Sequence, residues 1–190
     1  MITDSIMKHI PEDTLGTNHE LYVLNYTGTN GLSQRRVRNT LEHMKPDFVY
    51  VHLGINDIFR NTAVKEISAN LGEFSVFAHD KLKDSKIIFS LPLTTNKHDE
   101  CEQVRQLHAL TMSWIVKSCP PELPVDDRQC YFVTNQNMRT IEWTQKIQFF
   151  SRDGIHLTSS GKETILKNFR YRIHSMARTA LQKRRQHTTS

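Results

Sequence analysis

The sequence predicts an α/β domain in which helices cover both faces of a parallel sheet. Strand-like runs alternate along the chain with segments whose apolar residues recur at helical spacing, and this alternation is typical of parallel α/β folds. The length of 190 residues suits one domain with a substantial core. Apolar residues make up 37% of the chain, which is low for a globular protein but well above disordered composition.

Runs of β-branched and aromatic residues predict the strands. They cover residues 21–26, 47–53, 86–91 and 130–133. A further strand should end at Asp4, where only three residues precede it, so this first and normally central strand is expected to be truncated. We therefore consider either a sheet with a very short first strand or an unstable, inactive fragment.

Helices are expected between the strands, over residues 33–44, 64–82, 100–117 and 160–183. In the second of these, Ile67, Leu71 and Phe74 share one face. We expect residues 1–163 to form the domain, helix 160–183 to close it and pack on it, and residues 184–190 to be a basic tail. The poorly patterned stretch 135–152 is a candidate loop for covering a site.

Composition indicates where in the cell the protein is found and whether it binds a metal or cofactor. No apolar run approaches the roughly 20 residues of a membrane span, and no secretory leader is visible. Three cysteines without Cys-x-x-Cys spacing argue against a disulfide framework or a zinc site. We therefore expect an intracellular, cytoplasmic protein. The histidines lack ligand spacing, so we expect no metal and no cofactor.

Positive charge gathers near the C-terminus. After Glu163 there is no acidic residue, whereas seven Lys and Arg lie between Lys167 and Arg185, more than the whole net charge of +5. A basic helix of this kind can contact nucleic acid or anionic lipid. It can equally be a solvated helix end whose cations suit the negative pole of the helix dipole. Both interpretations stay open.

Short polar motifs follow the predicted strands. They are Asp4-Ser5-Ile6, Gly28 to Gly31, Gly54-Ile55-Asn56-Asp57 and Thr94 to Asn96. The carboxyl ends of parallel strands meet at one edge of the sheet, so these motifs should share one rim. Asp153-Gly154-Ile155-His156 adds a carboxylate and an imidazole three residues apart. A serine, oxyanion donors and a histidine tied to a carboxylate are the ingredients of acyl transfer.

The order of these residues resembles the SGNH (GDSL-type) hydrolase family from Thr3 to Gly161. Asp4-Ser5-Ile6 is similar to the first block of that family, Gly54-x-Asn56-Asp57 to its third, and Asp153-x-x-His156-Leu157-Thr158-x-x-Gly161 to its last. The resemblance implies a three-layer α/β/α sandwich with a flavodoxin-like parallel sheet. The order is also similar to the esterase domain in the first open reading frame protein of fish LINE retrotransposons.

The resemblance implies a role for each residue. Ser5 would be the nucleophile, His156 its general base, and Asp153 the residue that orients the imidazole. The oxyanion hole would use the Asn56 side-chain amide and the backbone amides of Gly31 and Ser5. Asp4, Gly54 and Asp57 would support the site, with Asp57 pinning the loop. The implied activity is metal-independent hydrolysis of acyl or acetyl esters on lipids or sugars.

Several alternatives remain at this point. Asp153 is also a favourable helix cap, and Gly54 to Asp57 has the composition of an ordinary turn. Gly28 can replace Gly31 as the oxyanion donor, and the Gly28 to Gly31 spacing also occurs in KH domains. Thr3 stands where most family members have glycine, and its β-branched side chain is bulkier beside the nucleophile. The alternative function is a binding module that keeps the fold and holds nucleic acid or anionic membrane through its basic helix.

Overall fold

A computed structural model gives the fold of the chain. It describes residues 1–3, 23–26, 28–90, 92–93, 98–118, 129–133, 135, 138, 147–154 and 156–187. Asp4, Ser5 and the segment 94–96, all predicted to lie at the site, fall outside the described residues.

The described strands form one parallel sheet with the order β2-β1-β3-β4-β5. Its strands are β1 (Ile2–Thr3), β2 (Leu24–Asn25), β3 (Phe48–His52), β4 (Lys86–Ser90) and β5 (Cys130–Val133). This is the flavodoxin-like doubly wound order, in which ligands bind beyond the carboxyl ends of the strands. The predicted α/β fold is therefore confirmed.

The strand β1 is very short yet is an inner strand of the sheet, between β2 and β3. Ile2 pairs with Leu24 on one side and with Val51 on the other. The side chains of Ile2 and Thr3 are fully buried. A two-residue strand thus joins β2 to β3, and the sheet accommodates the short first strand that the sequence predicts.

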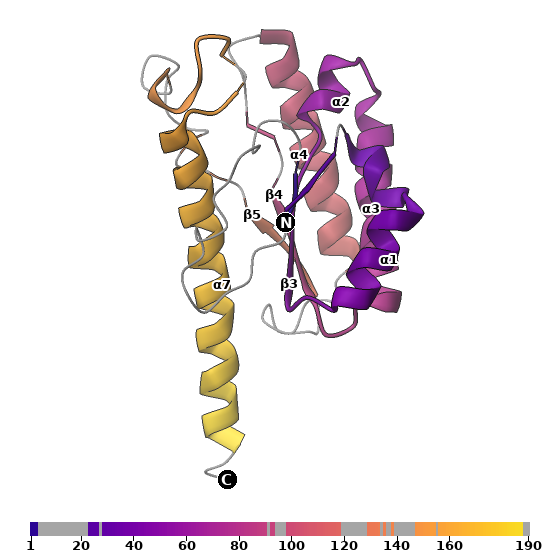
Figure 1. Ribbon diagram of the computed structural model, residues 1–190, viewed down its shortest axis with the longest axis vertical. Helices are drawn as coiled ribbons and strands as arrows, with labels where there is room; N and C mark the ends of the chain where they lie inside the picture. The colour runs from indigo at the N-terminus through magenta and orange to yellow at the C-terminus, as the bar shows by residue number, and fades with distance from the viewer. Residues whose placement is uncertain are drawn as a thin grey trace.

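Strands β3 and β4 form the centre of the core. Val49, Tyr50 and Val51 are consecutive and all buried, as are Ile87, Ile88 and Phe89. Side chains alternate between the faces of a sheet, so burial of consecutive residues requires cover on both faces. Figure 1 shows that cover, with α7 on one side of the sheet and α1, α3 and α4 on the other.

Among the described helices, the four longest follow the predicted segments closely, whereas the three short ones lie where no helix was predicted. The described helices are η3 (Thr29–Ser33), α1 (Arg35–Met44), α2 (Ile55–Phe59), α3 (Val64–Lys81), α4 (His98–Ser118), η5 (Ile147–Phe149) and α7 (Ser159–His187). Helix α2 was not foreseen, because its residues have the composition of a turn. No described helix is long and apolar enough to cross a membrane.

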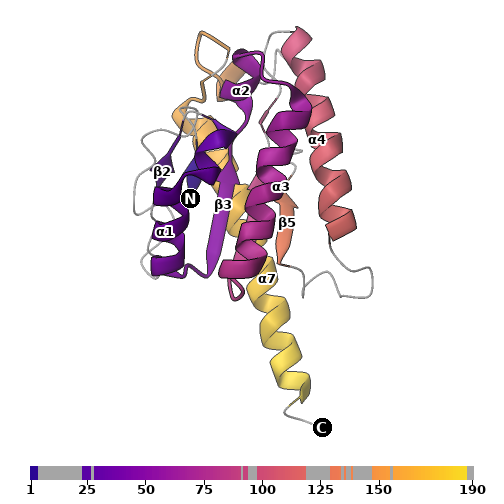
Figure 2. The same ribbon diagram turned by 90° about the vertical axis from the view of Figure 1, so that its right-hand side faces the viewer.

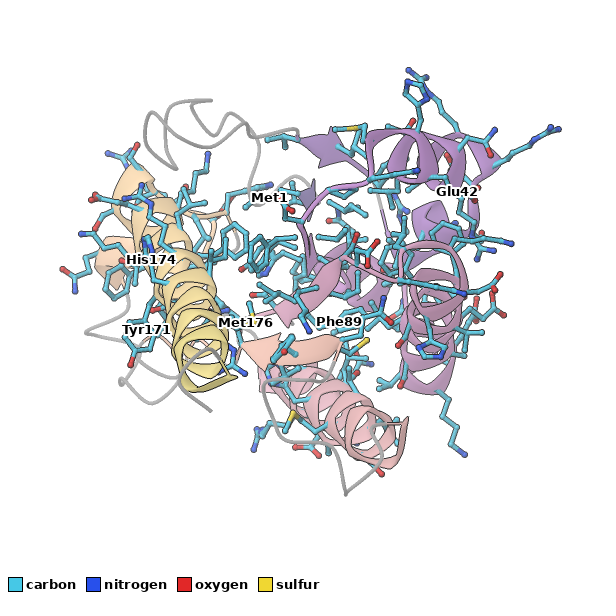
Figure 3. All side chains as sticks on the ribbon, turned by 90° about the horizontal axis from the view of Figure 1, so that it is seen from below. Met1, Glu42, Phe89, Tyr171, His174 and Met176 are labelled. Carbon is cyan, nitrogen blue, oxygen red and sulfur yellow. The ribbon has the colours of Figure 1, made fainter. Side chains whose placement is uncertain are left out.

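Helix α7 closes the domain and continues beyond it. Phe169 packs against Tyr50 of β3, with ring centroids 4.5 Å apart. Figure 3 shows Met176 on the side of α7 that faces the sheet, and Tyr171 and His174 on the outer side. The C-terminal turns of α7 extend past the rest of the molecule in both Figure 1 and Figure 2. The helix reaches His187, into the segment predicted as a tail.

Candidate active site

A tight hairpin brings Asp153 and His156 together. The Asp153 Oδ1 atom accepts the backbone N–H of His156 at 3.0 Å. The Oδ2 atom of the same carboxylate lies 2.6 Å from the His156 Nδ1 atom. One carboxylate therefore fixes both the backbone and the imidazole of His156. The two side chains are 45% and 49% exposed, so the imidazole remains open to a substrate.

Backbone contacts hold the hairpin in shape. Phe150 and Leu157 form an antiparallel bridge, and the Ser151 N–H donates to the His156 carbonyl at 2.7 Å. At the tip, Gly154 has a φ of 69°, a left-handed conformation that glycine adopts without strain. This geometry explains why glycine follows Asp153.

Thr158 attaches the hairpin to α7. Its Oγ1 atom accepts the Gly161 N–H at 3.2 Å, which satisfies a free amide in the first turn of α7. The same hydroxyl donates to the Gln148 carbonyl at 2.8 Å. Thr158, rather than Asp153, is therefore the capping residue of α7. The cap alternative for Asp153 is not what the structure shows.

The arrangement defines the chemistry available to His156. A carboxylate at Nδ1 accepts a hydrogen bond from Nδ1–H and favours the tautomer with a free lone pair on Nε2. An imidazole held in this way can accept a proton from a nearby hydroxyl. The pair thus has the geometry of a general base with its orienting carboxylate.

Gly54 and Asn56 lie where β3 leads into α2. Gly54 has a φ of 122°, and a Cβ atom there would meet Leu107 and Pro92 at 3.2 Å. Glycine is required at this turn on both grounds. Asn56 is half-buried in the first turn of α2. Its side-chain amide makes no hydrogen bond to another described residue.

The loop after β2 carries the second glycine motif. The Gly31 N–H donates to the Gly28 carbonyl at 3.2 Å, which closes the first turn of η3. The Gly28 N–H, in contrast, makes no hydrogen bond to a described residue. Of the two backbone amides, only that of Gly28 remains available in the described part of the chain.

These loops share one end of the molecule. Figure 1 and Figure 2 both place α2 and the segment that contains η5 at the same end of the sheet. The described parts of all three motifs therefore lie at the carboxyl ends of the strands. The described residues do not include Ser5, so its predicted place beside His156 stays a prediction.

A buried polar network lies at the ends of β3 and β4. The His52 Nδ1 atom is 3.0 Å from the Ser90 hydroxyl, which accepts the Asn135 side-chain N–H at 2.7 Å. The Asn168 side-chain N–H of α7 donates to the side-chain Oδ1 atom of Asn135 at 2.9 Å. Burial lowers the pKa of His52 to about 4, so the ring is neutral at physiological pH. The network links two strands to α7.

Sequence reasoning missed the supporting residue Thr29, whereas Thr158 belongs to the last motif quoted above. Thr29 bonds to Asp57, a contact between residues distant in sequence that no local pattern reveals. Thr158 does carry a local signal, because threonine immediately before a helical pattern is a favoured cap. Within the described chain, no group of three His, Cys, Asp or Glu residues could hold a metal.

Comparison with solved structures identifies esterases that share this fold. A family 3 carbohydrate esterase from Clostridium thermocellum is 17% identical, with 87% of this chain and 73% of that chain covered and a TM-score of 0.61. A family 3 carbohydrate esterase from Talaromyces cellulolyticus is 12% identical, with 86% and 75% covered and a TM-score of 0.66. An acetylxylan esterase from Geobacillus stearothermophilus is 18% identical, with 88% and 90% covered and a TM-score of 0.63.

Sequence comparison adds nothing to this likeness. No family model matches the chain, and no curated protein matches it. None of the three solved structures is a retrotransposon protein, so the narrower resemblance gains no support from them. At these identities the likeness establishes the fold alone, which is the α/β fold of these esterases.

Proposed function

We propose that this protein is a serine-dependent carboxylic ester hydrolase that works through an acyl-enzyme. The observation that carries this proposal is the Asp153–His156 pair, whose 2.6 Å contact orients an accessible imidazole at the carboxyl ends of a parallel sheet. An oriented base is what a weak serine nucleophile requires. If Asp153 served only as a helix cap, its carboxylate would not need the contact with the His156 imidazole.

The Geobacillus esterase supports the assignment of the three residues. Its catalytic mutants replace a serine near the start of the chain, an aspartate, and a histidine three residues after that aspartate. In the present chain Ser5 lies near the start, and Asp153 and His156 have the same spacing. The fold likeness covers both chains almost entirely, which makes the shared order meaningful.

The proposed reaction has two steps. The Ser5 hydroxyl attacks the ester carbonyl while His156 accepts its proton, and the tetrahedral intermediate collapses as His156 returns that proton to the leaving alcohol. Water then attacks the acyl-enzyme, again with His156 as base, and releases the acid and free Ser5. Asp153 stays ionised and stabilises the imidazolium formed in each step.

The oxyanion would be stabilised by the Asn56 side-chain amide and the backbone amides of Ser5 and Gly28. We propose Gly28 in place of Gly31, since the Gly31 N–H is already bonded to the Gly28 carbonyl at 3.2 Å. A donor engaged in this way is less available to a developing negative charge. Asn56 suits the role because its amide is not committed to another described residue.

The proposed substrates are esters of short acyl groups, acetate above all, on a sugar or lipid alcohol. The three esterases named above include one that acts on acetylxylan and two carbohydrate esterases. The half-exposed His156 also suits an ester whose alcohol part is bulky and stays largely in solvent. A contact of the Lys167–Arg185 helix with nucleic acid or anionic lipid stays one of the two open interpretations of its positive charge.

Hydrolysis of p-nitrophenyl acetate and of longer acyl esters tests this function. We expect wild type to hydrolyse the acetate ester fastest and Ser5→Ala to be inactive, because the nucleophile is lost. Ser113→Ala, which removes an exposed hydroxyl on α4, is the matched control and should keep full activity. A fluorophosphonate should label Ser5 in wild type and release fluoride.

Circular dichroism on each variant separates loss of chemistry from loss of fold. Equal activity in folded Ser5→Ala and wild type would exclude Ser5 as the nucleophile. A folded wild type that neither hydrolyses esters nor reacts with the fluorophosphonate would refute the proposed function and favour the binding module.

A further inference from the structure

The carboxylate of Asp57 is buried between two of the loops that form the proposed site. Asp57 is only 5% exposed and lies beside Asn56 in the first turn of α2. Its Oδ2 atom accepts the backbone N–H of Thr29 at 2.8 Å, across 28 residues of sequence. Thr29 directly follows Gly28. One side chain therefore connects the turn that carries Asn56 to the loop that carries Gly28.

Further contacts make this connection rigid. The Thr29 hydroxyl also hydrogen-bonds to Asp57 and accepts the Asn70 side-chain N–H of α3 at 3.1 Å. Burial raises the pKa of Asp57, while the Thr29 hydrogen bonds and the charge of Arg60 oppose that change. A buried carboxylate is tolerated only where hydrogen bonds replace its hydration. The contacts to Thr29 supply them here.

The backbone of Gly28 lies close against the same carboxylate. Its φ of 174° is extended backbone that any residue adopts, so conformation does not require glycine at this position. A Cβ atom on residue 28 would lie 3.0 Å from the Asp57 Cγ atom and closer still to Oδ1. To make room, the carboxylate would have to move and strain its bond to Thr29. Glycine at position 28 is therefore required by the presence of Asp57.

We propose that Asp57 is a positioning residue that holds the Gly28 amide in register with the Asn56 amide, so that both donors meet one oxyanion. This inference rests on the proposed function and deepens it. Asp57 does not touch the reacting atoms. It acts by fixing the distance between two donors, and an oxyanion hole depends on donors that are in place before charge develops.

The first test compares Asp57→Asn with Asp80→Asn, an exposed acid that pairs with Lys81. The asparagine has nearly the same shape but loses the charge that holds Thr29. We expect kcat for p-nitrophenyl acetate to fall by roughly 10- to 100-fold, with KM changed less than about 3-fold, because the donors act mainly in the transition state. Fluorophosphonate labelling of Ser5 should slow in proportion, and Asp80→Asn should match wild type.

The second test uses the contact between Gly28 and Asp57. Gly28→Ala should lower kcat by about 10-fold or more in wild type, since the new methyl displaces the carboxylate. In an Asp57→Ala background, which removes the obstacle, the same change should cost less than about 3-fold. Thr29→Val, which removes one hydroxyl and keeps the backbone N–H, should give a smaller loss of kcat and serves if Asp57→Asn does not fold.

The outcomes are distinct. Wild-type kcat in folded Asp57→Asn, or additive effects of the Gly28 and Asp57 changes, would overturn the positioning role while ester hydrolysis by Ser5 stands. A parallel rise in KM with unchanged kcat would also overturn it, because that pattern indicates lost substrate binding. A wild type without esterase activity would overturn both the proposed function and this inference.

Discussion

Asp153 and His156 show that two residues only three positions apart can form an oriented carboxylate–imidazole pair by themselves. The carboxylate bonds to the backbone of His156 at 3.0 Å and to its ring at 2.6 Å, so the backbone and the tautomer are set by the same group. Because both contacts span only three residues, the sequence could predict them. The pair is partly exposed, and its value is therefore orientation rather than stability.

Asp153→Asn tests that orienting role. The amide can present its N–H to Nδ1 and favour the tautomer that lacks a free lone pair on Nε2. We expect kcat to fall by roughly 100- to 10,000-fold with little change in the free energy of unfolding. Steady-state kinetics and urea denaturation measure the two effects. Asp84→Asn, an exposed acid in the turn before β4, is the control. An Asp153→Asn variant with wild-type kcat would contradict the role.

The choice between Gly28 and Gly31 could not be predicted from sequence. Both glycines lie in the same short loop, and their spacing does not reveal which amide is free. The answer depends on η3, whose first turn uses the Gly31 N–H. It depends also on Asp57, which comes close to Gly28 only after the chain has folded. The first contact is local but depends on the form that the loop takes, and the second joins residues distant in sequence.

At the scale of elements, the hairpin and α7 form one unit joined by Thr158. The same junction explains why residue 161 is glycine, because a Cβ atom there would collide with the Phe149 carbonyl. The start of α7 therefore lies directly against η5. Any change at this joint should affect both the helix and the position of His156.

Thr158→Val should destabilise the protein by about 1 kcal/mol, since the cap for α7 is lost. It should also lower kcat several-fold, because the hairpin that carries His156 loses its bond to Gln148. Urea denaturation and ester hydrolysis measure these effects, and Thr158→Ser, which keeps the hydroxyl, should be close to wild type. Full stability in Thr158→Val would show that the hydroxyl contributes nothing.

Helices and strands with a clear hydrophobic periodicity were predicted well, and the short helices were not. The aromatic-containing run at β5 and the apolar periodicity of α3 match their predicted positions within a residue. Helix α2 has only five residues, and Gly, Asn and Asp favour turns in isolation. Its helical form comes from the fold around it, which leaves no room for a side chain at Gly54 because Leu107 and Pro92 lie close by.

For the whole molecule, the buried His52 makes stability depend on pH. Its pKa is about 4 in the folded state and 6.5 in the reference state, because burial disfavours the charged ring. The unfolded chain therefore binds the proton first, and stability falls as pH drops from 6.5 towards 4. The shift corresponds to about 3 kcal/mol when fully developed.

Urea denaturation at several pH values tests this dependence. We expect His52→Gln to remove a decline of about 3 kcal/mol in the free energy of unfolding between neutral pH and pH 4. His43→Gln, on the exposed end of α1, controls for loss of a histidine as such. The same decline in His52→Gln and wild type would assign the acid sensitivity to other groups.

The sheet order imposes a sequence of events on folding. Ile2 of β1 needs partners at positions 24 and 51, and β2 and β3 have no pairing with each other. The Asp153–His156 turn, by contrast, is complete within four residues. During synthesis β1 must therefore wait for chain made later, whereas the Asp153–His156 contact can form as soon as His156 has been added. A chain that stops before His156 therefore lacks the proposed base, whatever part of the sheet has already formed.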